Sequence, residues 1–121
     1  MQRSESLSDG PNTTTISEGR QAIDLGCGAG IETLALLRAG WRVYAADVAP
    51  GTRERVLATT DEPDPARLTV QVTDLRTLRD LPPGDLIYAG YTLPYIGSDH
   101  FPFVWRLIRA RLRPGAWLGV N

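Results

Sequence analysis

Residues 24–30 read Asp24-Leu25-Gly26-Cys27-Gly28-Ala29-Gly30, and this stretch decides the fold. It follows a short apolar run at residues 22–23 and leads into residues 31–37, whose apolar pattern predicts a helix. A strand, a glycine-rich turn and a helix in that order form a pocket for an anionic or polar ligand. Glycines let the backbone approach the ligand, and the helix start offers unpaired N–H groups. Asp24, two positions before the first glycine, favours a ligand that carries positive charge or several donors over a plain pyrophosphate.

The glycine spacing narrows the choice of ligand. A dinucleotide-binding turn needs G-x-G-x-x-G, and the third glycine would then fall on Ile31. The observed pattern is G-x-G-x-G with an acid in front, which resembles motif I, (D/E)-x-G-x-G-x-G, of the class I S-adenosylmethionine-dependent methyltransferases. The matching positions are Asp24, Gly26, Gly28 and Gly30. The alternative is a glycine turn that only connects a strand to a helix.

Bulk composition limits the class of protein. The 121 residues are enough for one domain, and the net charge of −1 gives no electrostatic reason to expect nucleic acid or a membrane surface as partner. All 13 basic residues are arginine, so no catalytic lysine exists. The single Cys27 cannot form an internal disulfide, which favours a cytoplasmic location, and we expect it to pack inside the glycine turn. No apolar run approaches the roughly 18 residues of a membrane span, and the sequence suggests no metal site.

Strand and helix patterns alternate after a polar N-terminal segment. Residues 1–19 predict a flexible arm, and residues 20–121 the S-adenosylmethionine-binding domain. We expect strands at 21–25, 42–47, 68–72, 85–89 and 116–120. Helical segments are expected at 31–39, from Pro50 to residue 57, briefly at 75–81, and after a cap at Ser98 or Asp99. This order predicts an α/β fold, a Rossmann-like parallel sheet with helices on both faces and ligands at the carboxyl ends of its strands.

Two further acids follow predicted strands. Asp47 ends the second strand, where a carboxylate accepts hydrogen bonds from both hydroxyls of a ribose; the alternative is a cap for the helix near Pro50. Asp74 follows the third strand, and the alternative there is an N-cap for the next segment. The methyltransferase resemblance implies that Asp47 binds the ribose with Val48 packed on the adenine. It also implies that Asp74 accepts from the adenine amino group while the backbone N–H of Leu75 serves a ring nitrogen.

The segment after the fourth strand corresponds to motif IV of the resembling family, beside the transferable methyl group. The resemblance implies a cofactor contact for Tyr88 and an aromatic substrate pocket from Tyr91 and Tyr95; the alternative is that these tyrosines fill the core. His100 is a candidate general base or a surface or capping residue. The chain lacks the (N/D/S)-P-P-(Y/F/W) motif of DNA amino-methyltransferases, which argues against a nucleic-acid substrate. Residues 112–117 resemble the L-(K/R)-P-G-G-x-L turn before the fifth strand.

We therefore expect S-adenosylmethionine as cofactor and methyl transfer to a small-molecule acceptor. The methionine part would face Asp24, Gly26, Cys27, Gly28 and Gly30, and no residue is assigned to catalysis. The set is similar to the tellurite-resistance and thiopurine-type branch of the family. The family sheet continues beyond a fifth strand, so we expect its C-terminal strands to be missing and the fifth-strand edge to allow self-association. The alternatives are a non-catalytic or partner-completed binding module and a nicotinamide-dependent oxidoreductase.

Overall fold

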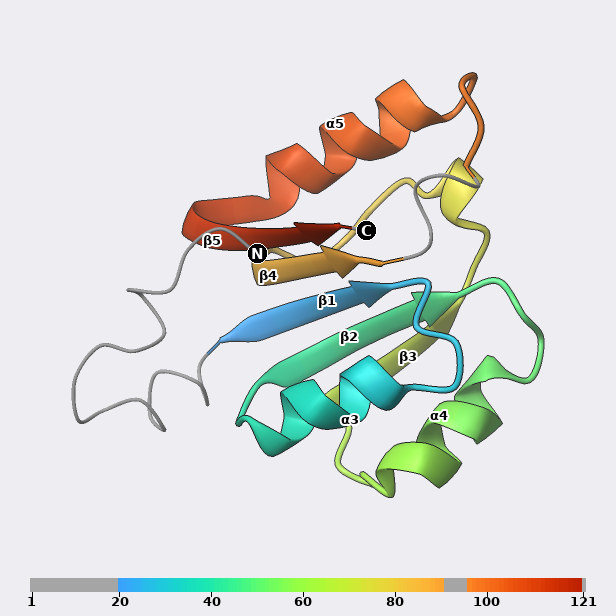
Figure 1. Ribbon diagram of the computed structural model, residues 1–121, viewed down its shortest axis with the longest axis vertical. Helices are drawn as coiled ribbons and strands as arrows, with labels where there is room; N and C mark the ends of the chain where they lie inside the picture. Colours follow the sequence, from blue (N-terminus) through green and yellow to red (C-terminus); the bar gives the residue numbers. More distant parts are fainter. Residues whose placement is uncertain (1–19, 91–95, 121) are drawn as a thin grey trace.

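The computed structural model describes residues 20–90 and 96–120, which form one parallel five-stranded sheet in the order β3-β2-β1-β4-β5 (Figure 1). The strands are β1 Gln21–Leu25, β2 Arg42–Asp47, β3 Leu68–Val72, β4 Gly84–Ala89 and β5 Leu112–Val120. The helices are α3 Ile31–Arg38, α4 Thr52–Thr60 and α5 Phe101–Arg111, with a short 3-10 helix, η1, at Leu75–Thr77. The Rossmann-like fold predicted from the alternating pattern is confirmed.

The order of the strands places a ligand position at the centre of the sheet. The chain moves outward from β1 through β2 to β3, then returns to place β4 on the other side of β1. Asp24 on β1 is in register with Ala45 on β2 and with Tyr88 on β4. The strand order therefore reverses beside the carboxyl end of β1, where ligands of open α/β sheets bind.

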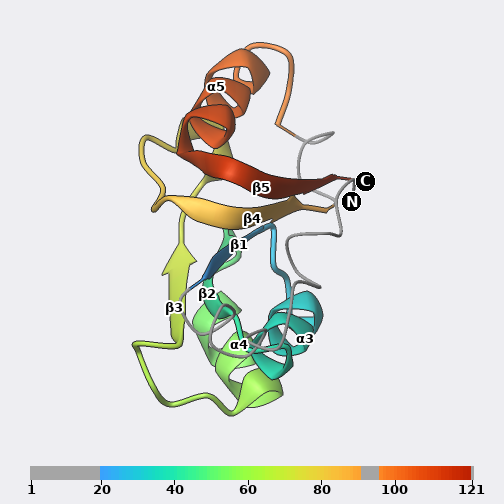
Figure 2. The same ribbon diagram turned by 90° about the vertical axis from the view of Figure 1, so that its left-hand side faces the viewer.

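Helices cover both faces of the sheet. In Figure 1, α5 lies above the sheet and α3 and α4 lie below it. Alternation along the strands divides the buried residues into two cores: Ala22 packs on the side of α3 and α4, and Ile23 on the side of α5. Figure 2 shows the twist of the sheet, with β3 nearly perpendicular to β5 in that view.

Several element boundaries differ from the prediction. Helix α4 begins at Thr52, after Pro50, and the Thr52 hydroxyl donates to the Ala49 carbonyl at 2.6 Å. The α5 cap predicted at Ser98 or Asp99 is wrong: the N-cap is His100, whose carbonyl accepts from the N–H groups of Phe103 and Val104.

The fifth strand begins at Leu112 and not at residue 116, because α5 passes directly into extended backbone. The Arg113 guanidinium donates to Asp85 on β4 at 3.0 Å and holds this early part of β5 against its neighbour. The register shifts between Gly84 and Leu86, where the longer strand accommodates the extra residues. The expected arm at residues 1–19 lies outside the described residues.

Candidate functional site

The glycine turn between β1 and α3 is fixed to the end of β2. The N–H groups of Gly26 and Cys27 both donate to the Ala46 carbonyl, at 2.8 and 3.0 Å. Gly28 and Gly30 have φ values of 56° and 95°, in the left-handed region that favours glycine. The hydrogen bonds and the glycine φ values therefore fix the conformation of the turn at the place where the strand order reverses.

Gly28 and Gly30 serve different purposes in this turn. A Cβ on Gly30 would lie 3.2 Å from the Val56 side chain, so this glycine allows α4 to pack closely. A Cβ on Gly28 would meet nothing within 4 Å. The backbone at Gly28 thus borders open space, as a turn that receives a ligand must.

The start of α3 has donors to offer to such a ligand. Its N-cap is Gly30, which has no side chain to bond the first N–H groups of the helix. These groups and the positive end of the helix dipole favour an anionic or carbonyl oxygen at this place. Ile31, the residue where a dinucleotide turn would have its third glycine, is 68% exposed beside them.

Asp24 is buried beneath the turn. Its side chain is 1% exposed, and its Oδ2 accepts a 2.7 Å hydrogen bond from the hydroxyl of Thr33 in the first turn of α3. Burial raises the pKa of the Asp24 carboxyl to about 6; the Thr33 hydrogen bond opposes the rise, and nearby Glu32 and Asp47 add to it. The contact predicted between Asp24 and the methionine part of the cofactor stays a prediction. The observed contact joins the end of β1 to α3.

Asp47 connects the end of β2 to the glycine turn. Its Oδ2 accepts from the Gly28 N–H at 2.8 Å, and its Oδ1 accepts from the N–H groups of Val48 and Ala49 at 2.7 and 3.3 Å. These contacts hold the turn and the start of the β2–α4 loop, but they do not cap α4, whose N-cap is Gly51 and has no side-chain cap hydrogen bond. The adjacent Val48 side chain is 57% exposed and gives the site an apolar surface.

Asp74 caps η1, as the alternative reading of the sequence predicted. Its carboxylate accepts from the Arg76 backbone N–H at 2.9 Å and from the Arg76 guanidinium, with Nη2 at 2.8 Å from Oδ2. The hydrogen bonds from Arg76 lower the pKa of Asp74 to about 2. The Leu75 side chain is buried in the core on the α5 side, so only its backbone is available to a ligand.

Two other predicted cofactor contacts border the turn. Cys27 is buried, and burial raises the pKa of its thiol to about 12, which agrees with a packing role. Tyr88 lines a cavity of about 280 Å³ with Glu32, Leu36 and Leu86, between α3 and β4. A Cβ at Gly90 would lie 2.9 Å from the Tyr88 ring, so a larger residue there would displace the end of this side chain.

The predicted substrate residues are only partly described. Tyr91 and Tyr95 lie outside the described residues. His100 is exposed at the start of α5, and its charge helps to lower the pKa of Asp74, which places it on the η1 side of the site. Within residues 20–90 and 96–120, no three His, Cys, Asp or Glu side chains are grouped to hold a metal ion. No helix in the part of the chain that the structure describes has the length and apolarity needed to cross a membrane.

Two contributors to the site were missed from the sequence. Thr33 donates a hydrogen bond to the Asp24 carboxylate. The sequence signal for this contact was a hydroxyl side chain in the first turn of the helix that follows an acid at the end of a strand. Arg76 forms a salt bridge with Asp74. The sequence signal for this contact was a basic residue two positions after the proposed N-cap. Both are local pairs whose geometry depends on the turn between them.

Comparisons with known proteins identify the family and the fold of the chain. A family model described as "Methyltransferase domain" matches residues 22–115. TehB from Haemophilus influenzae is 16% identical, with a TM-score of 0.75 over 90% of this chain and 38% of that one. An S-adenosylmethionine-dependent methyltransferase from Mesorhizobium loti is 23% identical, with a TM-score of 0.70 over 92% and 53%. Phosphoethanolamine N-methyltransferase 1 from Haemonchus contortus, in complex with phosphoethanolamine and S-adenosylhomocysteine, is 20% identical, with a TM-score of 0.68 over 78% and 20%.

The chain spans about half of the length of the matched structures, or less. Among curated protein sequences, no match was found.

Proposed function

The chain belongs to the methyltransferase-domain family, and from that premise we propose that it binds S-adenosylmethionine and transfers the methyl group to a small-molecule acceptor. The proposal rests most on one observation: the open backbone at Gly28 lies directly beside the Asp47 carboxylate, at the carboxyl ends of β1 and β2. A ligand in that space would contact the turn and the acid together.

The described residues fit the parts of this cofactor. Helix α3 begins without a side-chain N-cap, so the N–H groups of its first turn suit the carboxylate of the methionine part. Asp47 accepts three backbone N–H groups, and a carboxylate has about four acceptor sites, so capacity remains for a ribose hydroxyl. The exposed Val48 side chain offers a surface for the adenine ring. Asp74 and the Leu75 backbone would serve the adenine edge, with Arg76 fixing the Asp74 carboxylate.

Asp24 supports the site from below. A buried carboxylate with a raised pKa is a group that positive charge would stabilise. The ammonium and sulfonium groups of S-adenosylmethionine are of that sign, so bound cofactor would favour the ionised form of Asp24. We propose that this electrostatic effect, and the Thr33 contact that holds the turn, are its contributions.

The chemistry requires alignment more than a reactive side chain. S-adenosylmethionine supplies a methyl group already activated on a sulfonium, so the protein must bring the acceptor in line with it and exclude water. We assign no catalytic residue. Tyr91, Tyr95 and His100 remain proposals for the acceptor side, as do the cofactor contacts of Gly26, Cys27, Gly30 and Tyr88. The small-molecule acceptor is supported by the Haemonchus contortus neighbour, whose complex contains phosphoethanolamine.

The position of β5 at the end of the sheet carries a second part of the proposal. Among the described strands β5 pairs only with β4, and a strand at the end of a sheet is the place where another chain can add a strand. We propose that a second copy pairs there, which sedimentation equilibrium tests: a dimer at micromolar concentration is expected, and a monomer throughout overturns it. The lone buried Cys27 favours the cytoplasm as the place of action.

Isothermal titration calorimetry tests the cofactor assignment. S-adenosylmethionine and S-adenosylhomocysteine are expected to bind and NAD is not; binding of NAD alone would overturn the proposal. Asp47→Ala should weaken S-adenosylmethionine binding by about 10- to 100-fold, because hydrogen bonds to a charged acceptor are lost. Asp64→Ala is the matched control, since Asp64 also accepts a backbone N–H, that of Ala66 at 2.9 Å, but lies before β3 at the opposite end of the sheet. Cofactor binding without turnover on any small nucleophile would favour the binding-module alternative.

A further inference from the structure

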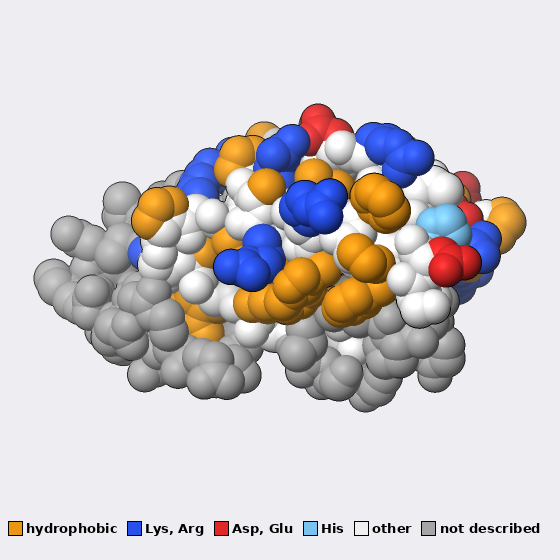
Figure 3. Space-filling model, turned by 90° about the horizontal axis from the view of Figure 1, so that it is seen from above, with side chains coloured by type: hydrophobic (Ala, Val, Ile, Leu, Met, Phe, Trp, Pro, Cys, Tyr) orange, Lys and Arg blue, Asp and Glu red, His pale blue; other side chains and the backbone are white. Residues whose placement is uncertain are grey.

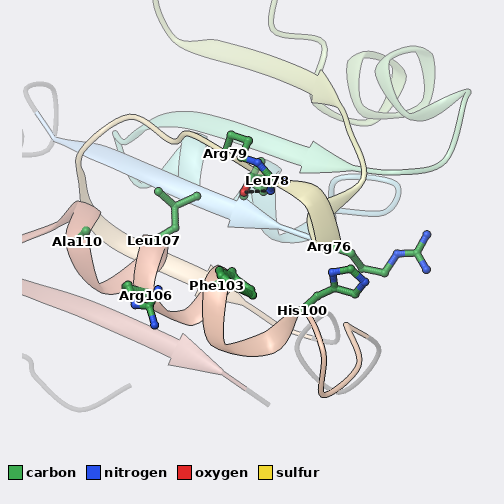
Figure 4. Close-up of a pocket in the computed structure, with 8 residues that line it drawn as sticks. All are labelled: Arg76, Leu78, Arg79, His100, Phe103, Arg106, Leu107 and Ala110. Carbon is green, nitrogen blue, oxygen red and sulfur yellow. Dashed lines mark hydrogen bonds between the residues drawn. The ribbon is translucent and has the colours of Figure 1, made fainter.

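A groove of about 560 Å³ lies between α5 and the segment that follows β3, on the face of the sheet opposite α3 and α4 (Figure 4). Its polar lining comes from His100 and three arginines, Arg76, Arg79 and Arg106. Its apolar lining comes from Leu78, Phe103, Leu107 and Ala110. None of the described residues that line it is Asp or Glu.

The cationic side chains approach the groove from two elements. In Figure 4, Arg79 and Arg106 lie on opposite walls, and Arg76 lies with His100 at one end. The Arg79 Nη1 donates to the Thr77 carbonyl at 3.0 Å, which holds the side chain against its own segment. The Arg106 guanidinium lies 5.8 Å from the centre of the Phe103 ring, a cation–π distance. Both arginines are thus positioned while most of their five donors remain available.

Two of the acids near the groove, Asp74 and Asp80, are paired with arginines. Asp74 is bound to Arg76, and Asp80 is bound to Arg111 with Nη2 and Oδ1 2.7 Å apart. In residues 20–90 and 96–120, neither Arg79 nor Arg106 has a carboxylate within ion-pair distance. The groove therefore has unneutralised positive charge on both walls.

The apolar lining lies between these charges. Phe103 is 61% exposed although it belongs to a helix whose Val104 and Ile108 are buried against the sheet. Leu78 forms a buried floor, and Leu107 and Ala110 extend the apolar surface along α5. Figure 3, which looks down on α5, shows hydrophobic and arginine side chains interspersed on this face and acidic ones at its margins.

We propose that this groove binds an organic anion, a phosphate or carboxylate attached to an aromatic or aliphatic body. The anionic group would accept hydrogen bonds from Arg79 and Arg106, and the apolar body would cover Phe103 and Leu78. An inorganic anion would satisfy only the guanidinium groups and a neutral apolar molecule only the ring. Arg76 and His100 also border the proposed methyltransferase site, but the anion contacts proposed here are those of Arg79 and Arg106, which have no part in that site, so this inference does not depend on the proposed cofactor.

Arginine side-chain NMR tests the proposal directly, because it observes the guanidinium groups that would bind the anion. The chain contains no lysine, so arginine signals report on all of its Lys and Arg side chains. Phenyl phosphate should shift the Nε–H signals of Arg79 and Arg106 with a saturable curve. Inorganic phosphate and phenol should each bind about tenfold more weakly or worse, since each lacks one half of the ligand. Arg79→Gln and Arg106→Gln assign the signals, and each should weaken phenyl phosphate binding about tenfold.

Arg109→Gln is the matched control, because Arg109 belongs to the same helix but does not line the groove. Its affinity for phenyl phosphate should equal that of the unmodified protein. Equal weakening in all three variants, or equal affinity for phenyl and inorganic phosphate, would overturn the proposal and indicate general charge attraction. Unchanged affinity in Arg79→Gln and Arg106→Gln would overturn it as well. The titration needs no cofactor, so its failure leaves the methyltransferase proposal untouched.

Discussion

Asp24→Asn is expected to stabilise the ligand-free protein at neutral pH. The carboxyl is 1% exposed, and its burial raises its pKa from 3.8 to about 6. An asparagine side chain has nearly the same shape and an amide oxygen that can accept from Thr33. The variant therefore removes the buried charge while it keeps the hydrogen bond.

The size of the effect follows from the pKa difference. The folded protein binds the Asp24 proton more tightly than the unfolded chain, so the free energy of unfolding falls as the pH rises from about 4 to about 6. A difference of about two units at 1.36 kcal/mol each gives a loss of about 3 kcal/mol, complete above pH 7. Asp24→Asn lacks this loss, and all other groups titrate alike in both proteins. Part of the loss is already present at pH 4, so the stability difference between the two proteins should change by about 2 to 2.5 kcal/mol between pH 4 and pH 7.

Urea unfolding followed by circular dichroism at pH 4, 5, 6 and 7 measures this difference. Thr33→Val is the control in the opposite direction: it leaves the buried carboxylate without its partner and should destabilise the protein by about 1 to 3 kcal/mol at pH 7. A constant difference between wild type and Asp24→Asn across this range would refute the buried-charge reasoning. We also expect the stabilised variant to bind S-adenosylmethionine more weakly, because a positive ligand no longer has a negative group beneath it.

Three more predictions concern the turn and its neighbours. Gly30→Ala should lower the free energy of unfolding, measured in urea, by about 2 to 4 kcal/mol, because the new Cβ lies close to Val56 on α4 and the backbone keeps a positive φ. Gly28→Ala should lower it by only about 1 to 2 kcal/mol, because only the positive φ opposes the new side chain. Equal losses in the two variants would contradict the packing argument. The Cys27 thiol, with its pKa raised to about 12, should resist iodoacetamide at pH 8 until the protein is unfolded, and rapid labelling of the native protein would show that it is accessible. Arg76→Gln should raise the pKa of Asp74 from about 2 towards its ordinary value, as measured by the carboxyl carbon shift; an unchanged pKa would remove Arg76 as the cause.

Local patterns were sufficient to predict most of the fold. The observed bounds of β1, β2 and β3 equal the predicted ones, because each strand is a short apolar run ended by a glycine turn or an acid. The start of α5 was misplaced since Ser98 and Asp99 have the right side chains for a cap, yet the turn at Gly97 places His100 at the helix start. A cap depends on backbone geometry that residue preferences alone do not determine.

The sequence predicted which residues lie at the candidate site, but it did not predict their burial or their hydrogen-bond partners. Asp24 and Asp47 lie at the ends of β1 and β2 and Asp74 lies just after β3, and the carboxyl ends of these parallel strands meet at one edge, so their proximity could be inferred. Their states could not, because burial of Asp24 depends on how α3 packs over it. The groove beside α5 was also beyond sequence reasoning, since it joins Arg79 and Arg106 from segments that only the fold brings together.

Backbone amide NMR with S-adenosylmethionine is the most direct test of the central claim that the glycine turn and the end of β2 hold the cofactor. Saturable shifts are expected for the amides of Gly28, Gly30, Val48 and Leu75, which follow the carboxyl ends of β1, β2 and β3. The amide of Ala66, at the opposite end of the sheet, should not move. A folded protein whose turn amides stay unshifted at saturating cofactor, or whose shifts fall only along α5, would contradict the account.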